Sequence, residues 1–187
     1  MQRIRPFINT DLIKVFTGIR RAGKSVMLEL VKNELKESGI GEENFLCINF
    51  EQFSNSQFLD VESLYKKITD FQKNTKGKIY LFFDEIQEVD GWEKCINSCR
   101  IDFDCDIYIT GSNAKLLSGE LATYLAGRYV EFVIYPFSFA EFFEMNLIKN
   151  PNLDKATCFM QFLKTGGMPF LSIFPDDDSA KSQYLID

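Results

Sequence analysis

Residues 11–36 read DLIKVFTGIRRAGKSVMLELVKNELK, the most informative stretch of the chain. Residues 11–17 form an apolar run typical of a buried strand, and Val26–Lys36 has the pattern of a helix. Between them, Gly18–Ser25 matches G-x-x-x-x-G-K-S without departure, which is the phosphate-binding loop. A strand, this loop and a helix in that order are the context that the motif requires. We therefore expect a nucleoside triphosphate to bind here.

The loop also predicts how the phosphates are held. Its glycines let the backbone curl so that N–H groups point at phosphate oxygens, and the helix that follows adds the positive end of its dipole. We expect Lys24 to reach the β- and γ-phosphates and the Ser25 hydroxyl to ligate Mg²⁺. A glycine turn with a solvated lysine is the alternative. The predicted nucleotide-binding set is Gly18, Ile19, Arg20, Arg21, Ala22, Gly23, Lys24, Ser25 and Val26.

The composition is that of a globular chain. With 187 residues and 45% apolar side chains, we expect one domain and part of a second. The net charge is −6 and no block of basic residues stands out, so a broad nucleic-acid surface is not indicated and DNA binding stays undecided. No apolar stretch approaches the roughly 18 residues of a membrane span, and Met1–Pro6 lacks the apolar run of a signal peptide. We expect a cytoplasmic protein without a membrane segment.

The chain has no histidine and five cysteines. Cys95 and Cys99 stand one helical turn apart and could supply half a metal site, but no second pair has zinc spacing. Buried, reduced thiols are the preferred interpretation. Without histidine, catalysis must use carboxylates, lysine, arginine, hydroxyls and a metal ion.

Five apolar runs predict a parallel sheet, because strands covered by helices on both faces are apolar throughout. Helical patterns lie between them, which predicts an α/β three-layer sandwich with right-handed crossovers. The pattern of strands stops after Pro136, and a capping box at Ser138 and Glu141 begins a further helix. We expect a nucleotide-binding domain at 1–150 and the incomplete beginning of a helical lid or second domain at 151–187. The expected strands are 12–17, 44–50, 79–83, 106–110 and 129–134, and the expected helices are 26–36, 61–73, 91–100, 114–125, 138–146 and 157–164.

Residues 79–85 read IYLFFDE, an apolar strand that ends in two carboxylates. A buried parallel strand would deliver Asp84 at its carboxyl end, beside the phosphate loop. We expect Asp84 to hold Mg²⁺ and Glu85 to orient or deprotonate the attacking water. A strand that runs into an acidic turn is the alternative.

Two further groups complete the predicted site. The strand 106–110 ends in Thr110, Gly111, Ser112 and Asn113. The polar side chains at this strand end could contact the γ-phosphate or the attacking water, or simply cap the next helix. Arg128 precedes the last strand, where it could stabilise charge on the transferring phosphoryl group or form a surface ion pair. The predicted catalytic residues are Lys24, Glu85, Asn113 and Arg128, and the predicted metal ligands are Ser25 and Asp84.

Together these motifs resemble one family, the AAA-like predicted ATPases of bacteria and archaea. The likeness rests on Gly18–Ser25, Leu81–Gln87 with Gly91–Glu93, Ile109–Asn113, Leu125–Tyr129 and Tyr135–Phe139. It implies a P-loop fold of the additional-strand type, with the strand 44–50 between the loop strand and the Asp84 strand, and ATP and Mg²⁺ as ligands. It also implies a lid that begins near Gly166 and a C-terminal partner domain that this chain lacks.

Three functions remain open from the sequence. An ATP hydrolase that moves a lid or partner domain is favoured, because Glu85 supplies a base that a pure switch does not need. A nucleotide-gated switch with little hydrolysis is the second. A small-molecule kinase is the third, and it would need an acceptor pocket. A homo-oligomer is a possible assembly, with Arg128 acting within its own site or across a subunit interface.

Overall fold

The computed structural model describes residues 1–111 and 125–172. The chain divides into two compact units: Met1–Gly18 with Lys24–Val133, and Ile19–Gly23 with Ile134–Asp187. The tip of the phosphate loop thus groups with the residues after the sheet. The domain division expected from the sequence, at residue 150, stays a prediction.

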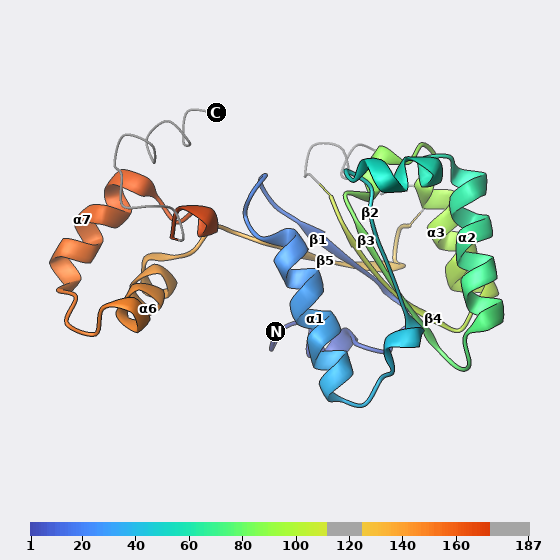
Figure 1. Ribbon diagram of the computed structural model, residues 1–187, viewed down its shortest axis with the longest axis horizontal. Coiled ribbons are helices and arrows are strands. Elements are labelled where there is room, and N and C mark those ends of the chain that lie inside the picture. Colours follow the sequence, from blue (N-terminus) through green and yellow to red (C-terminus); the bar gives the residue numbers. More distant parts are fainter. Residues whose placement is uncertain (112–124, 173–187) are drawn as a thin grey trace. The chain divides into compact units, whose positions relative to one another are not determined.

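The first unit is built on a five-stranded parallel sheet with the order β2-β3-β4-β1-β5 (Figure 1). The prediction of a parallel α/β sheet is therefore confirmed. One detail of the topology was wrong: β4 lies between β1 and β3, whereas residues 44–50 form the edge strand β2. Sequence order does not fix the order in a sheet, since helical crossovers let a strand skip a neighbour. The strands are β1 Ile13–Thr17, β2 Phe45–Asn49, β3 Ile79–Asp84, β4 Cys105–Thr110 and β5 Tyr129–Val133.

Helices cover both faces of this sheet. Helix α1, Lys24–Glu37, lies on one face and contacts β1, β3 and β4. Helices α2, Val61–Asn74, and α3, Trp92–Asp102, lie on the opposite face (Figure 1). These bounds agree with the expected helices to within two residues at each end, and the helix expected at 114–125 lies almost wholly outside the described residues. Short 3-10 turns connect the elements: η1 Arg5–Phe7, η2 Glu42–Asn44, η3 Phe53–Phe58 and η4 Ile86–Glu88.

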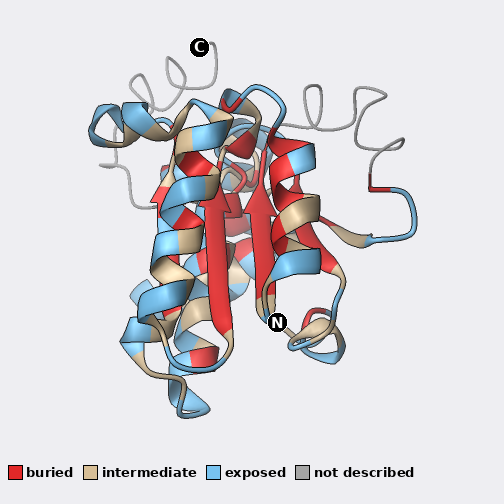
Figure 2. Cartoon of the chain, turned by 90° about the vertical axis from the view of Figure 1, so that its right-hand side faces the viewer, coloured by how far each residue is buried: buried red, intermediate tan, exposed pale blue. Residues whose placement is uncertain are grey.

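The two faces of the sheet have different cores. Alternate residues of β3 show this: Ile79, Leu81 and Phe83 join an aliphatic cluster with α2 and α3. Tyr80 and Phe82 point to the α1 side, where rings dominate, and Phe82 stacks on a β4 ring at 4.7 Å. Figure 2 shows the strands buried along most of their length and the helices buried on one side only. Burial on both faces explains why these strands are apolar throughout.

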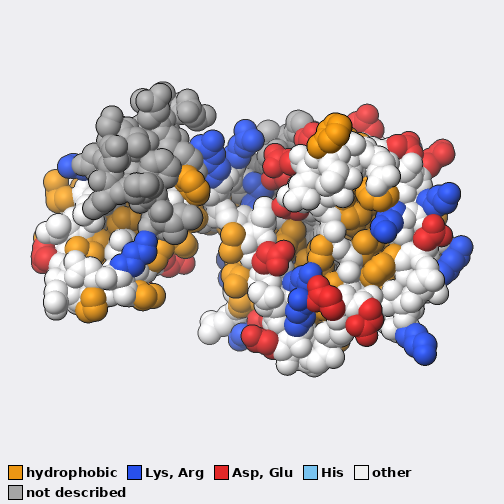
Figure 3. Space-filling view, in the orientation of Figure 1, with side chains coloured by type: hydrophobic (Ala, Val, Ile, Leu, Met, Phe, Trp, Pro, Cys, Tyr) orange, Lys and Arg blue, Asp and Glu red, His pale blue; other side chains and the backbone are white. Residues whose placement is uncertain are grey.

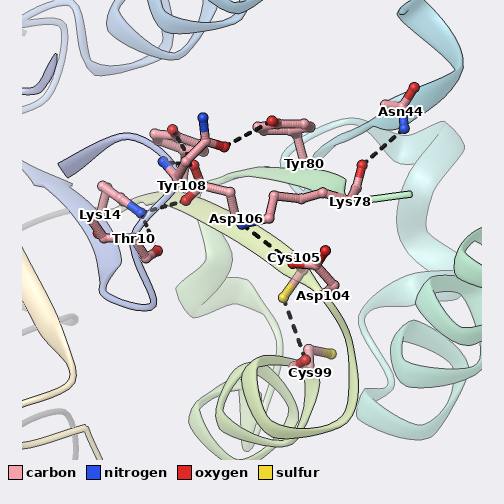
Figure 4. Close-up of polar contacts among 11 residues, drawn as sticks. Thr10, Lys14, Asn44, Lys78, Tyr80, Cys99, Asp104, Cys105, Asp106 and Tyr108 are labelled. Carbon is pink, nitrogen blue, oxygen red and sulfur yellow. Dashed lines mark hydrogen bonds and ion pairs between the residues drawn. The ribbon is translucent and has the colours of Figure 1, made fainter. Parts of the chain in front are cut away.

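A buried polar cluster lies at the amino ends of the strands, opposite the edge that carries the phosphate loop (Figure 4). Lys14 on β1 and Asp106 on β4 form an ion pair in which neither side chain has exposed surface. Asp106 also accepts hydrogen bonds from the Tyr108 hydroxyl and the Asn9 backbone N–H, both at 2.7 Å. Burial lowers the pKa of Lys14, and the Asp106 carboxylate opposes this shift. The cluster ties the N-terminal segment to the sheet.

The second unit contains the helices α6, Phe139–Lys149, and α7, Lys155–Thr165, and the turn η5, Pro169–Ser172. The expected capping box at Ser138 and Glu141 is present. The two helices pack through phenylalanine rings, with the Phe139 and Phe159 centroids 4.9 Å apart. Gly167 is required by a close approach, because a Cβ there would stand 1.9 Å from the Phe137 carbonyl oxygen. Among the residues that the model describes, no helix has the length and apolarity to cross a membrane.

Candidate nucleotide site

The phosphate loop has a backbone that glycine makes possible. Gly18 and Gly23 have φ angles of 144° and 103°, and Arg21, with φ 67°, is left-handed as well. Helix α1 begins directly at Lys24. The Lys24 side chain is only 4% exposed, and its Nζ lies 3.4 Å from the Gly18 carbonyl oxygen. The lysine is therefore folded back over its own loop, at the N-terminus of the helix.

Asp84 ends β3 and is held by two neighbouring strands. The Thr110 hydroxyl at the end of β4 donates to Asp84 Oδ1 at 2.5 Å. The Asn49 amide at the end of β2 donates to Asp84 Oδ2 at 3.0 Å. The Asp84 residue is 7% exposed, so both carboxylate oxygens are oriented in a largely buried setting. Parallel strands bring these three carboxyl ends together at one edge of the sheet.

Glu85 follows in a left-handed conformation, with φ 55° and ψ 50°. This conformation costs a non-glycine residue about 1–2 kcal/mol, so the surroundings must hold it. Its backbone N–H donates to the Thr110 hydroxyl at 2.9 Å. Its carboxylate lies 3.6 Å from Lys24 Nζ and accepts a 2.6 Å hydrogen bond from Gln87 Nε2. The lysine of the phosphate loop and the second carboxylate of the β3 motif, Lys24 and Glu85, thus lie close together at the carboxyl edge of the sheet.

A cavity of about 410 Å³ opens beside these groups, between α1 and the strands β2 and β3. Ser25 and Asp84 line one part of it, and Glu29, Lys32 and Cys47 line another. Cys47 is an exposed residue, but partial desolvation raises the pKa of its thiol, and Lys32 partly opposes this shift. The complete lining is Ser25, Val26, Leu28, Glu29, Lys32, Cys47, Ile48, Asn49, Gln52, Asn55, Phe82 and Asp84.

The donors in this cavity fit Mg²⁺. Within residues 1–111 and 125–172, no three His, Cys, Asp or Glu side chains are grouped closely enough to hold a metal ion. One hydroxyl and one carboxylate are nevertheless the set that Mg²⁺ uses when nucleotide phosphates and water complete its shell. Ser25 and Asp84 line the same cavity and supply this pair.

The remaining predicted residues have different outcomes. Ser112 and Asn113 lie outside the described residues. Arg128 is exposed, and its Nη1 lies 3.1 Å from Asn97 Oδ1 on α3, so the structure gives it a contact within the chain. Ile19, Arg20 and Arg21 are exposed in the loop, whereas Ala22 is 4% exposed.

Sequence reasoning missed Asn49 and Gln87, and it placed Thr110 at the end of its strand without predicting that its hydroxyl binds Asp84. Asn49 and Thr110 both orient Asp84, and Gln87 holds Glu85. A usable signal existed for the first two: each is a polar residue that ends an apolar strand, and such ends meet at one edge of a parallel sheet. Gln87 stood in the quoted motif, but spacing alone could not show that its amide turns back to Glu85.

The comparison with known families is decisive. The family model described as "AAA domain" matches residues 10–143, which include the whole sheet and the site. The chain belongs to this AAA domain family. The resemblance inferred from the motifs is therefore confirmed.

Two relatives align with nearly the whole chain. An uncharacterized protein of Haemophilus influenzae is 42% identical over 185 residues, which cover 99% of this chain and 46% of that protein. An uncharacterized protein of Methanocaldococcus jannaschii is 36% identical over 186 residues, which cover 92% of this chain and 39% of that protein. The chain thus spans less than half the length of these two relatives.

Solved structures share the fold at low identity. The replication initiator DnaA, bound to AMPPCP and single-stranded DNA, has a TM-score of 0.61 at 18% identity, covering 99% of this chain and 58% of that one. PCH-2 of C. elegans has a TM-score of 0.60 at 13% identity, covering 97% and 63%. These likenesses show that the chain shares its fold with these proteins.

Proposed function

We propose that this protein binds ATP with Mg²⁺ and hydrolyses it to ADP and phosphate, and that the nucleotide state moves a lid or partner domain. The observation that carries the proposal is the meeting of Lys24 and Glu85 beside Asp84, at 3.6 Å from Nζ to Oε1. A lysine from the phosphate loop and a second carboxylate, one residue beyond a buried aspartate, make up the minimal apparatus for phosphate binding and water activation.

In this proposal each side chain has a separate task. Lys24 binds the β- and γ-phosphate oxygens, which requires it to exchange Glu85 for phosphate. Ser25 and Asp84 hold Mg²⁺, which neutralises phosphate charge when it is bound. Glu85 Oε1 accepts a proton from the attacking water, whose oxygen bonds to the γ-phosphorus as the bond to the β-phosphate oxygen breaks. Thr110 and Asn49 keep Asp84 in place through the cycle.

The coupling to a lid is supported by the way the chain divides. Residues 19–23 of the phosphate loop belong to the same compact unit as residues 134–187. A change at the loop on nucleotide binding would therefore act on the unit that contains α6 and α7. The matched relatives are more than twice as long as the aligned segment, so a partner domain beyond this segment is the second element we propose to move.

A small-molecule phosphotransferase is the second candidate, and the cavity beside Ser25 and Asp84 favours it. Its volume of about 410 Å³ is in the size range of a small-ligand pocket, and amides, Glu29 and Lys32 supply polar contacts. Hydrolysis remains the better explanation, because the Glu85 carboxylate lies 3.6 Å from Lys24 Nζ, a position that suits activation of water.

The test is ATP turnover with separate measurement of ADP and inorganic phosphate. A hydrolase releases the two in equal amounts, whereas a phosphotransferase forms ADP without matching phosphate. Glu85→Gln should retain ATP binding and lose about a hundredfold or more in turnover, because the amide keeps the size and loses the proton acceptor. Lys24→Ala should weaken ATP binding by more than about tenfold, equivalent to about 1.4 kcal/mol. ATP bound tightly by the wild type without turnover would instead support the nucleotide-gated switch.

A further inference from the structure

The backbone around Glu85 is fixed on both sides. Its N–H donates to Thr110, and its carbonyl oxygen accepts from the Glu88 N–H at 3.2 Å. The turn η4 is anchored by Ile86 and Val89, which are 0% and 1% exposed. The backbone of this turn is therefore held in place. The fold determines where its side chains begin and which neighbours they can contact.

Gln87 lies on this turn and approaches the Glu85 carboxylate. Its Nε2 donates to Glu85 Oε2 at 2.6 Å, while Lys24 Nζ stands 3.6 Å from the other oxygen, Oε1. The amide must present its nitrogen, because the carboxylate can only accept. The two carboxylate oxygens of Glu85 are thus held differently: Oε2 by a neutral amide, and Oε1 by the lysine expected to leave for the phosphates.

The oxygen of the Gln87 side-chain amide, Oε1, makes no hydrogen bond within the described residues, and it is buried. A glutamine that merely stabilised the turn would be expected to pair both ends, since an unpaired buried acceptor costs about 1–3 kcal/mol. Such a group in a folded protein calls for an explanation, and a functional role is one of those known.

We propose that Gln87 is a positioning residue for the proton acceptor, an inference that rests on the proposed ATP hydrolysis. By holding Oε2, the amide aims Oε1 at the space that Lys24 vacates when it binds phosphate. A neutral donor suits this task. A lysine or arginine at residue 87 would pair with the carboxylate and weaken it as a base, and an aspartate or glutamate would repel it.

The experiment compares Gln87→Met with Gln57→Met. Methionine keeps the length and the volume but removes the amide, and Gln57 is an exposed glutamine on η3 outside the site. Turnover of Gln87→Met should fall by about tenfold to a hundredfold, the range expected for a lost hydrogen bond to a charged group. Its ATP affinity should stay within about twofold of wild type, because the amide is not assigned any contact with nucleotide. The control should match wild type in both.

A double variant separates positioning from loss of structure. If Gln87 acts through Glu85, Glu85→Gln with Gln87→Met should turn over ATP no more slowly than Glu85→Gln alone. If Gln87→Met instead caused a general structural defect, turnover of the double variant would be lower than that of Glu85→Gln alone. The contact itself can be followed without turnover: the side-chain NH₂ resonances of Gln87 should shift in Glu85→Ala, while those of Gln57 should stay in place.

The outcomes distinguish this inference from the function on which it rests. The inference would be overturned if Gln87→Met had wild-type turnover, or if the Gln87 resonances did not shift in Glu85→Ala. Either result would leave the proposed ATP hydrolysis unaffected. Additive losses in the double variant would overturn it as well. Absence of turnover in the wild-type protein would remove the hydrolase and the inference together.

Discussion

Replacing Thr110 by valine tests the structural centre of the site. The Thr110 side chain has no exposed surface, and its hydroxyl links Asp84 Oδ1 to the Glu85 backbone N–H. Valine keeps the shape and removes both hydrogen bonds. One of the lost bonds is to a charged group, worth about 1.5–3 kcal/mol, and the other is neutral, worth about 0.5–1.5 kcal/mol. We expect the free energy of unfolding to fall by about 2–4.5 kcal/mol.

The same change should affect the ligand site. Asp84 would retain only the Asn49 amide, at 3.0 Å, and would be free to turn away from Ser25. Mg²⁺-dependent ATP affinity should therefore fall by about tenfold, or about 1.4 kcal/mol. Thr110→Ser restores the hydroxyl, loses one methyl group, and should recover the affinity.

The change in the free energy of unfolding can be measured by urea titration, with tryptophan fluorescence as the signal. Trp92 is the chain's one tryptophan and is 4% exposed at the start of α3, so its emission reports on the unit that contains the sheet. Titration calorimetry with and without Mg²⁺ measures the affinity. If Thr110→Val unfolds within about 0.5 kcal/mol of wild type, the hydroxyl does not bridge Asp84 and Glu85, and the reasoning is refuted.

Three further predictions follow from other contacts. Asp84→Asn should weaken ATP binding in Mg²⁺ and leave binding in excess EDTA nearly unchanged, as calorimetry in the two buffers would reveal; an equal loss in both would argue against a metal role. Lys14→Met should lower the free energy of unfolding by about 3–5 kcal/mol, because it leaves Asp106 charged and buried without its partner; a stability equal to wild type in urea would contradict that charge state. Arg128→Ala should lose about a thousandfold or more in turnover if the arginine acts as a finger, but should change turnover little if its contact with Asn97 is purely structural. Activity recovered on mixing Arg128→Ala with Lys24→Ala would indicate action between subunits.

The motifs alone predicted the fold class and the edge of the sheet at which their residues lie. Gly18–Ser25 required a strand before it and a helix after it, and the observed β1 and α1 agree. The apolar run ending in Asp84 and Glu85 pointed to the same edge of the sheet, because parallel strands present their carboxyl ends together. The first inference succeeded because strand, loop and helix patterns are local. The second succeeded because a parallel sheet presents the carboxyl ends of all its strands at one edge.

The contacts between the side chains of the site follow from the three-dimensional arrangement of the strands. The position of β4 between β1 and β3 brings Thr110 to Asp84, and the edge position of β2 brings Asn49 to its other oxygen. The left-handed turn at Glu85, which no local pattern required, carries the carboxylate toward Lys24 and Gln87. Such contacts join residues up to 61 positions apart, from Lys24 to Glu85. They depend on strand order and on a single backbone torsion, and neither is encoded by the spacing of residues along the chain.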